Sequence, residues 1–184
     1  MNRRRRILDG ATEAFYEHGF HGVGVDELAR RADLRGPSIY RHFSSKDEIL
    51  ATLMNEAMDE LSGAAVATGA DPATDLARAI RHHLDFAIEK RQLVVIYQRD
   101  SSAMADPWRA GFALRRESYT SRWEALLVNR YPDLDKERSS TVAQALLGMI
   151  FGVASWPPRT ARAPHVRDTL VALVEKGLAS LSRS

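Results

Sequence analysis

The chain of 184 residues is 45% hydrophobic and 27% charged, proportions that are typical of a folded globular protein and exclude a largely disordered one. It contains no cysteine, which excludes disulfide bonds, a cysteine nucleophile and thiolate metal ligands. Its net charge is only +2, but residues 1–46 carry +3 and the remainder −1, so the basic excess lies in the N-terminal quarter.

The first predicted element is a helix from residue 3 to about residue 18. Ile7, Ala11, Ala14 and Phe15 share one face of this helix, and Gly19 is placed to end it. The arginine run at residues 3–6 precedes no apolar segment of the kind found in signal peptides, and no apolar run is long enough to span a bilayer. We therefore expect a cytoplasmic protein.

Two short helices with a tight turn between them are predicted next. Residues 25–32 place Leu28 and Ala29 on an apolar face, with acids in the first turn and arginines in the last, as the helix dipole favours. Asp33 tolerates the left-handed backbone that a sharp turn needs. The following helix is predicted over residues 38–43, with Ile39 and Phe43 facing inward. Two helices joined by such a turn form a helix-turn-helix.

The outward face of the second short helix has an unusual composition. It combines hydroxyl, cationic and aromatic side chains, which bind phosphates and reach base edges in DNA. We assign Arg35, Ser38 and Arg41 to base edges and Tyr40, His42 and Lys46 to phosphates. The full set of candidate DNA-binding residues is Arg3, Arg4, Arg35, Gly36, Ser38, Tyr40, Arg41, His42 and Lys46. For the arginine run, a solvated or disordered tail is the alternative to a DNA-contacting arm.

Residues 7–50 resemble the DNA-binding domain of TetR-type transcriptional regulators. The resemblance rests on Ala14-Phe15 with Gly19, on Leu28-Ala29, and on Tyr40-Arg41-His42-Phe43 followed by Lys46 and Ile49-Leu50. Gly24, Asp33, Arg35 and Pro37 depart from the family pattern. The resemblance implies an all-α protein of about nine helices, with a helix-turn-helix domain over residues 1–46 and a helical effector-binding and dimerisation domain over residues 47–184.

The remainder of the chain is predicted to be helical. Ser44 is expected to cap a helix that runs to about residue 61, and residues 62–74 form a loop. Residues 93–97 could form a strand or a buried helix, and we choose a helix because no second strand is available to pair with it. Asp106-Pro107 opens a long helix that ends near Tyr131, and Pro157-Pro158 stops the next one.

The second domain is rich in aromatic and flexible apolar residues. Most of them are core residues, but wide apolar faces in a helical domain can also enclose a ligand. Family resemblance implies an inducer cavity and a lipid-like or acyl thioester effector. Arg115 or Arg116 could anchor its carboxylate or phosphate, but two exposed helix cations are the favoured alternative. The candidate pocket residues are Phe86, Ile96, Tyr97, Met104, Trp108, Phe112, Tyr119, Trp123 and Phe151.

The last two predicted helices carry apolar stripes wider than one core requires. Such stripes are either buried core or a four-helix interface between two copies of the chain, as the family resemblance implies. A homodimer is also what a palindromic operator requires, because two recognition helices must reach major grooves about 34 Å apart. The candidate interface residues are Val142, Leu146, Met149, Ile150, Val153, Val166, Leu170, Leu173, Val174 and Gly177.

Catalytic motifs with a supporting context are absent from the sequence. Gly22 and Gly24 begin like a dinucleotide-binding motif, but no strand precedes them and Glu27 stands where the third glycine belongs. His82 and His83 are adjacent, so on a helix they diverge too far to share a metal ion. We expect no enzyme activity, no cofactor and no metal site.

The sequence therefore predicts a DNA-binding transcriptional regulator, a repressor that a small apolar or amphipathic effector releases from a palindromic operator. Two alternatives remain open. One is an effector-independent DNA-binding protein whose second domain only dimerises or recruits a partner, and the other is a small enzyme or carrier that kept the fold.

Overall fold

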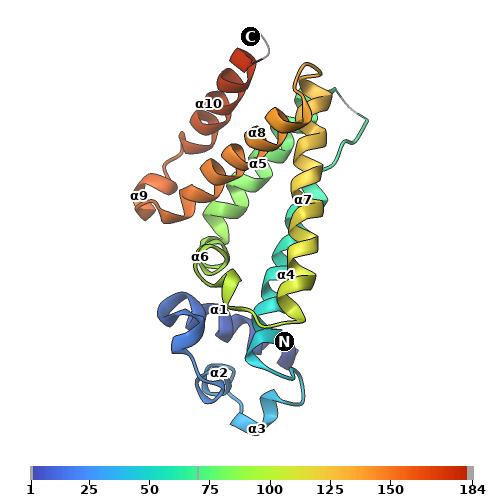
Figure 1. Ribbon diagram of the computed structural model, residues 1–184. Helices are drawn as coiled ribbons and strands as arrows, with labels where there is room; N and C mark the ends of the chain where they lie inside the picture. Colours follow the sequence, from blue (N-terminus) through green and yellow to red (C-terminus); the bar gives the residue numbers. More distant parts are fainter. Residues whose placement is uncertain (1, 70, 182–184) are drawn as a thin grey trace. The chain divides into compact units, whose positions relative to one another are not determined.

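The computed structural model describes residues 2–69 and 71–181, and this part of the chain is helical throughout, without strands, as the sequence predicts. Its helices are shown in Figure 1: α1 Arg3–Gly22, α2 Val25–Arg31, α3 Gly36–Ile39, α4 Lys46–Ala64, α5 Pro72–Glu89, α6 Arg91–Asp100, α7 Trp108–Arg130, α8 Lys136–Gly152, α9 Pro158–Ala161 and α10 Val166–Leu181, with two 3-10 helices at Ser101–Ala103 and Val153–Ser155. Sequence analysis missed the short α9.

The chain forms two compact units. The first comprises Met1–Ala57 and Gln92–Leu114, and the second comprises Met58–Arg91 and Arg115–Ser184. The limits fall inside α4, α6 and α7, so each of these helices contributes to both units. The predicted division between residues 46 and 47 stays a proposal. None of the helices in the described part of the chain is long and apolar enough to cross a membrane.

The core of the first unit is the one that the sequence predicts. Phe15 from α1, Leu28 from α2, Ile39 from α3 and Phe43 are all at most 1% exposed. A Cβ atom at Gly10 would lie 3.0 Å from Cβ of Arg31, so glycine at this position allows α1 and α2 to cross closely. Small helices of this kind depend on shared burial because short helices are marginal in isolation.

Two predicted turn residues are confirmed. Gly19 has φ 74 and ψ 159, which interrupts α1 and turns the chain before Phe20 packs against Phe15 at a ring-centroid distance of 5.5 Å. Asp33 has φ 53, in the left-handed region that aspartate tolerates better than most residues. These two turns set the directions in which α2 and α3 leave the preceding helices.

The start of α4 and the length of α3 differ from the prediction. Helix α3 ends at Ile39, and a turn follows in which N–H of His42 donates to O of Ile39 over 2.8 Å. Ser45, not Ser44, caps α4, because its Oγ accepts from N–H of Glu48 over 3.1 Å. Ser44 instead donates through N–H and Oγ to the Glu48 carboxylate, at 2.6 and 2.7 Å. This reciprocal pattern satisfies free groups on both sides of the helix start.

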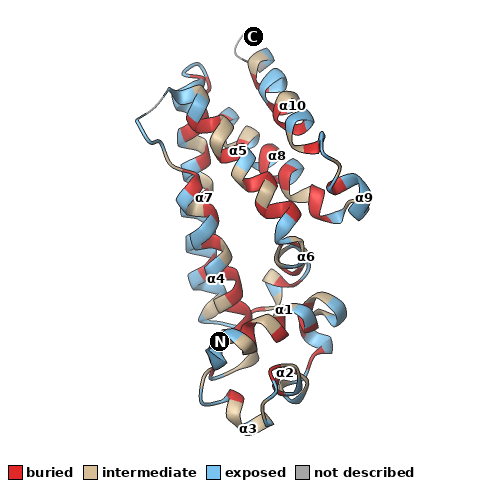
Figure 2. Cartoon of the chain, turned by 180° about the vertical axis from the view of Figure 1, so that it is seen from behind, coloured by how far each residue is buried: buried red, intermediate tan, exposed pale blue. Residues whose placement is uncertain are grey.

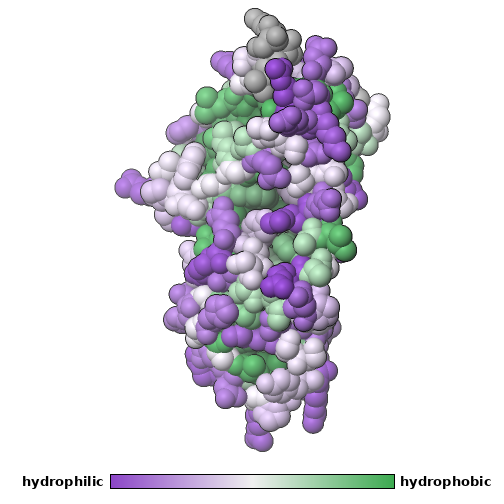
Figure 3. All heavy atoms as spheres, in the orientation of Figure 1, coloured by the Kyte–Doolittle hydropathy of each residue, from purple (hydrophilic) through white to green (hydrophobic). Residues whose placement is uncertain are grey.

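Helices α5, α8 and α10 pack together in the second unit, with buried residues along their facing sides (Figure 2). Asp75 is buried and accepts from N–H and Oγ of Thr68 at 2.9 and 2.6 Å, which ties the loop before α5 to its first turn. On the face shown in Figure 3, hydrophobic residues gather over α8 and α10. The unit therefore has an apolar interior and an apolar patch on its surface.

His83 is fully buried in α5 and lowers the stability of the fold in acid. Burial lowers its pKa to about 4, although the bond to O of Ala79 opposes the shift, and the neighbouring His82 adds to it. The unfolded chain therefore binds more protons than the folded chain between pH 6.5 and about 4. Stability is complete above this window and is lost as the pH falls through it.

We predict that the free energy of unfolding falls by about 2 kcal/mol from this group alone between pH 7 and pH 5. Urea unfolding at both pH values measures the loss. His83→Asn, which keeps a donor for O of Ala79 but does not titrate, should lose less stability over the same interval. Equal losses of stability in the wild-type protein and in His83→Asn would contradict the assignment of the acid sensitivity to His83.

Candidate nucleic-acid interface

Helix α3 and the turn after it present the predicted DNA-binding side chains on a small, firmly anchored element. Ile39 and Phe43 are buried beneath it, whereas Arg35, Tyr40 and Arg41 are exposed, Tyr40 by 59%. Gly36, Ser38 and His42 are half-buried. The arrangement places two guanidinium groups and a phenol on the outer surface, where they can reach phosphates or base edges.

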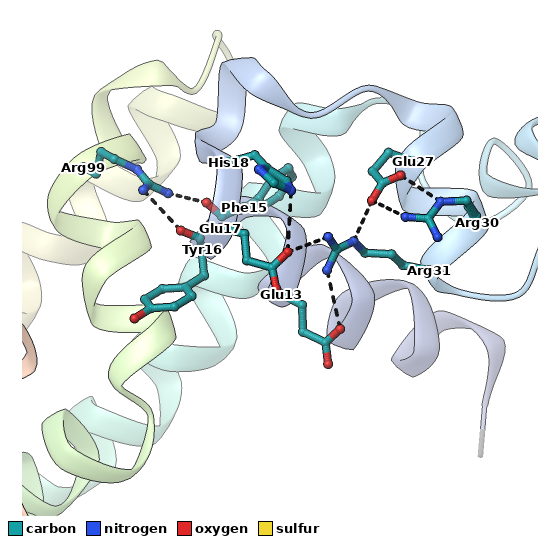
Figure 4. Close-up of polar contacts among 9 residues, drawn as sticks. All are labelled: Glu13, Phe15, Tyr16, Glu17, His18, Glu27, Arg30, Arg31 and Arg99. Carbon is teal, nitrogen blue, oxygen red and sulfur yellow. Dashed lines mark hydrogen bonds and ion pairs between the residues drawn. The ribbon is translucent and has the colours of Figure 1, made fainter. Parts of the chain in front are cut away.

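Helix α2 is held against α1 by a buried arginine rather than by a side-chain cap. Gly24, at its N-cap, has no side chain to contribute, as the sequence analysis anticipates. Arg31 is 16% exposed and contacts three carboxylates, those of Glu13 at 3.7 Å, Glu17 at 2.6 Å and Glu27 at 2.8 Å (Figure 4).

The carboxylate of Glu27 lies between two guanidinium groups. Arg30 and Arg31 both donate hydrogen bonds to it, and these bonds lower its pKa to about 2. The same contacts raise the pKa of Arg31, through Glu17 first and Glu27 second. The Glu27 carboxylate therefore keeps its charge well below the pH at which an ordinary glutamate is protonated, and its bonds to Arg31 fix α2 beside α1.

Two residues that the sequence assigns to DNA make internal contacts. The ammonium of Lys46 donates to O of Phe20 and O of Val23, both at 2.8 Å, and lies 4.3 Å from the Phe20 ring centroid. Arg4 donates to O of His42 over 3.1 Å and stacks over the Phe43 ring at 4.2 Å. In the free protein both cations satisfy backbone carbonyls at the ends of short segments, whereas Arg3 is exposed.

Sequence analysis missed Arg99, which joins α6 to α1 within the first unit. Its guanidinium donates to O of Phe15 and, over 3.3 Å, to O of Tyr16, at the point where Gly19 interrupts α1 (Figure 4). Asp100 is buried and pairs with it at 3.0 Å. Carbonyls at a helix end favour a cation. Only an Arg-Asp pair at the end of an amphipathic helix could have indicated this contact.

The candidate effector residues are divided between the two units. Ile96, Tyr97, Met104, Trp108 and Phe112 belong to the first unit, where Tyr97 and Phe112 have a ring-centroid distance of 6.1 Å.

The remaining candidates, Phe86, Tyr119, Trp123 and Phe151, belong to the second unit. The last three of these surround His83. Arg115 pairs with Asp59, and Arg116 is exposed.

The candidate dimer residues fall into two groups. Within the single chain the structure buries Leu146, Ile150, Val153, Val166, Leu170 and Val174, so these six also form core. Val142 is half-buried, and Met149, Leu173 and Gly177 are exposed. The alternative of buried core helices thus accounts for most of the apolar stripe, and the exposed minority is what a second copy could cover.

Two family models match the chain. Residues 7–53 match a model described as bacterial regulatory proteins of the tetR family, and residues 69–158 match a tetracyclin repressor-like C-terminal domain. The transcriptional activator FasR of Mycolicibacterium smegmatis is 38% identical over 87 residues, which cover 46% of this chain and 40% of FasR. The repressor KstR2 of Rhodococcus jostii is 29% identical over 99 residues, covering 52% and 48%. The chain thus spans less than half the length of these curated relatives.

Solved structures share the fold over nearly the whole chain. AibR, crystallised with isovaleryl coenzyme A and operator DNA, has a TM-score of 0.78, with 20% identity over 95% of this chain and 97% of AibR. PfmR of Thermus thermophilus has a TM-score of 0.79 and 23% identity, covering 95% and 97%.

We predict that Arg31→Ala lowers the urea midpoint of the first unit more than Arg30→Ala does. The first change leaves three carboxylates without their shared cation, whereas Arg30 is 71% exposed and contacts Glu27 alone among them. Hydrogen exchange of α1 and α2 amides localises the loss. Equal midpoints for the two variants would show that Arg31 does not hold α2 in place.

Proposed function

The chain belongs to the TetR family of bacterial regulatory proteins, and we propose that it is a homodimeric, sequence-specific DNA-binding transcriptional regulator. It acts as a repressor that leaves a palindromic operator when a small apolar or amphipathic effector binds. The observation that carries this proposal is the exposure of Arg35, Tyr40 and Arg41 on an element anchored by buried Ile39 and Phe43. A DNA-bound regulator works in the cytoplasm of a bacterium.

The residues of the interface divide into two roles. Arg35 precedes α3 and has a guanidinium that can bind guanine bidentately, whereas Ser38 lies within α3 and Arg41 in the turn after it. Tyr40 and His42 contact phosphates, which fix the orientation of the protein without reading the sequence. Arg4 and Lys46 support this surface through their bonds to backbone carbonyls, and Lys46 reaches a phosphate only if its present contacts rearrange.

We predict that selection from random duplexes enriches a palindrome whose half-sites lie about one helical turn apart. Arg35→Ala should relax the preference at one base pair per half-site, with a loss of about 1 to 3 kcal/mol against the wild-type site. Arg3→Ala, a change in the exposed arm, should instead weaken binding evenly across sequences and reduce its salt dependence. Failure to enrich any palindrome at modest salt would contradict the proposal.

A second copy of the chain covers the exposed faces of α8 and α10. A Cβ atom at Gly148, Gly152 or Gly177 would meet no atom of a neighbouring element within 4 Å in the described part of the chain. Leu173 is 58% exposed, and Met149 lies beside Gly148 on α8. Small residues on these helices allow close approach, and the exposed apolar side chains fill the interface. A dimer then presents two copies of α3 to the two half-sites.

We predict that Gly148→Phe converts the dimer to a monomer without loss of helix content, because a Cβ atom at this position meets only open space in one chain whereas the ring collides with a second. Gly111→Phe, at an equally open position on α7, is the matched control and should remain dimeric. Analytical ultracentrifugation and circular dichroism measure the two properties. A dimeric Gly148→Phe variant would place the interface elsewhere.

The effector is assigned by class only. AibR was crystallised with isovaleryl coenzyme A, and another relative is named a fatty acid metabolism regulator, which supports a lipid-like or acyl thioester effector. The effector changes the distance between the two recognition helices of the dimer through its different affinity for the two spacings, typically with about 1 to 3 kcal/mol of coupling. The alternative is an effector-independent protein whose second unit only dimerises or recruits a partner. A ligand that binds the second unit and changes the affinity for DNA distinguishes the two.

A further inference from the structure

Three helices of the second unit surround one imidazole with aromatic rings. His83 lies on α5, and its ring centroid is 4.7 Å from that of Trp123 on α7, in an edge-on arrangement. Tyr119 stacks on His83 at 5.8 Å, and Phe151 of α8 lies 6.5 Å away. His83 and Trp123 are both 0% exposed. The imidazole and the indole thus form a buried aromatic cluster carried by α5 and α7, the two helices labelled in Figure 1.

One ring nitrogen of His83 and one of Trp123 are left unsatisfied by the protein. Nδ1 of His83 lies 2.6 Å from O of Ala79, which can only accept, so Nδ1 carries the proton and Nε2 is an acceptor. Nε1 of Trp123 is a donor. Both Nε2 and Nε1 are buried and have no hydrogen-bond partner among the described residues. Buried polar groups without partners cost free energy. A group that binds here must therefore donate a hydrogen bond to one ring and accept one from the other.

The chemistry of the two atoms restricts what can satisfy them. Burial keeps the imidazole uncharged at neutral pH, because its pKa is about 4. A carboxylate has no proton for Nε2, and an ammonium has no lone pair for the indole N–H. Either ion would also lose its hydration inside an apolar cluster. A neutral group that donates one hydrogen bond and accepts another, such as a secondary amide or a hydroxyl, meets both requirements.

We propose that His83 and Trp123 form a polar subsite that recognises a neutral amide or hydroxyl of the effector. The inference rests on the proposed function, since it assigns a position and a chemical class to the effector of that regulator. The apolar remainder of the ligand lies against the rings of Tyr119 and Phe151. Specificity comes from the buried pair, because a site built for a donor and an acceptor rejects analogues that lack one of them.

The test uses matched small probes and the full-length wild-type protein. N-Butylhexanamide offers a donor and an acceptor, and its N-methyl derivative has lost only the donor. 1-Nonanol and 1-methoxyoctane form the corresponding hydroxyl pair. Calorimetric titration should show that the amide, the alcohol or both bind on the order of tenfold more tightly than the matched partner. A preference in the amide pair alone indicates that the subsite recognises an amide, and a preference in the alcohol pair alone indicates a hydroxyl.

Two variants remove one polar atom each. Trp123→Phe removes the donor, and His83→Asn keeps a donor for O of Ala79 but removes Nε2. His83→Asn should reduce the preference to about onefold to threefold, because Nε2 is the acceptor for the donor that distinguishes the probes. Trp123→Phe should weaken both members of a pair alike, because both keep the oxygen that accepts from the indole N–H. Trp156→Phe, at a half-buried tryptophan of the same unit, is the matched control and should keep the wild-type preference. A preference that survives in His83→Asn, or an unchanged affinity for both probes in Trp123→Phe, overturns the proposal.

A measurement on the wild-type protein tests the subsite even if the cluster variants fail to fold. The indole ¹⁵N–¹H signal of Trp123, assigned by elimination in Trp108→Phe and Trp156→Phe, should move downfield when the amide or alcohol is added. An unmoved signal, equal affinity for matched probes, or no probe binding means that the cluster holds at most water, and each overturns the subsite.

The experiments can contradict the subsite without contradicting the proposed function, and the reverse also holds. A protein that selects a palindromic operator but shows no probe preference retains the proposed function without this subsite. A protein that shows the preference and the indole shift but no operator, or no change in operator affinity with the probe, keeps the subsite and loses effector-controlled repression.

Discussion

Burial of Ile39 and Phe43 is the constraint on which the DNA-facing surface depends. Helix α3 has only four residues, too few to be stable alone, since helix nucleation is unfavourable and each short helix relies on tertiary packing. The two apolar side chains insert beside Phe15 and Leu28, and each is at most 1% exposed. The outward side chains of Arg35, Ser38 and Arg41 are consequently presented by a backbone that cannot rotate without exposing this core, which keeps the geometry needed to read bases.

Cations at backbone carbonyls supplement the hydrophobic core of the first unit. Lys46 binds the carbonyls of Phe20 and Val23, and Arg99 binds those at the interrupted end of α1. Each of these side chains satisfies acceptors that a helix end or a turn leaves free. The resulting unit contains long-range polar contacts between segments far apart in the sequence. These contacts, together with the Arg31 cluster, fix the orientation of α1 and α2 (Figure 4).

The second unit combines two uses of apolar helices. The inward residues of α8 and α10 complete the core of a single chain, while Leu173, Met149 and the open glycines leave a surface that a second copy can cover. Within the unit, His83 and Trp123 bring polar atoms without a hydrogen-bond partner into a largely apolar interior. Stability alone does not favour such atoms, because apolar residues of similar size would avoid the cost of desolvation. Their presence is better explained by recognition than by packing.

The sequence by itself determined the helical class, the turns at Gly19 and Asp33 and the core of Phe15, Leu28, Ile39 and Phe43, because helical periodicity and local backbone preferences are properties of neighbouring residues. Only the tertiary structure decided that Lys46 and Arg4 bind backbone carbonyls, that Arg99 reaches α1, and that most of the α8 and α10 stripe is buried in one chain. Long cationic side chains can reach several partners, and an apolar stripe does not state what covers it, so both depend on segments that only folding brings together.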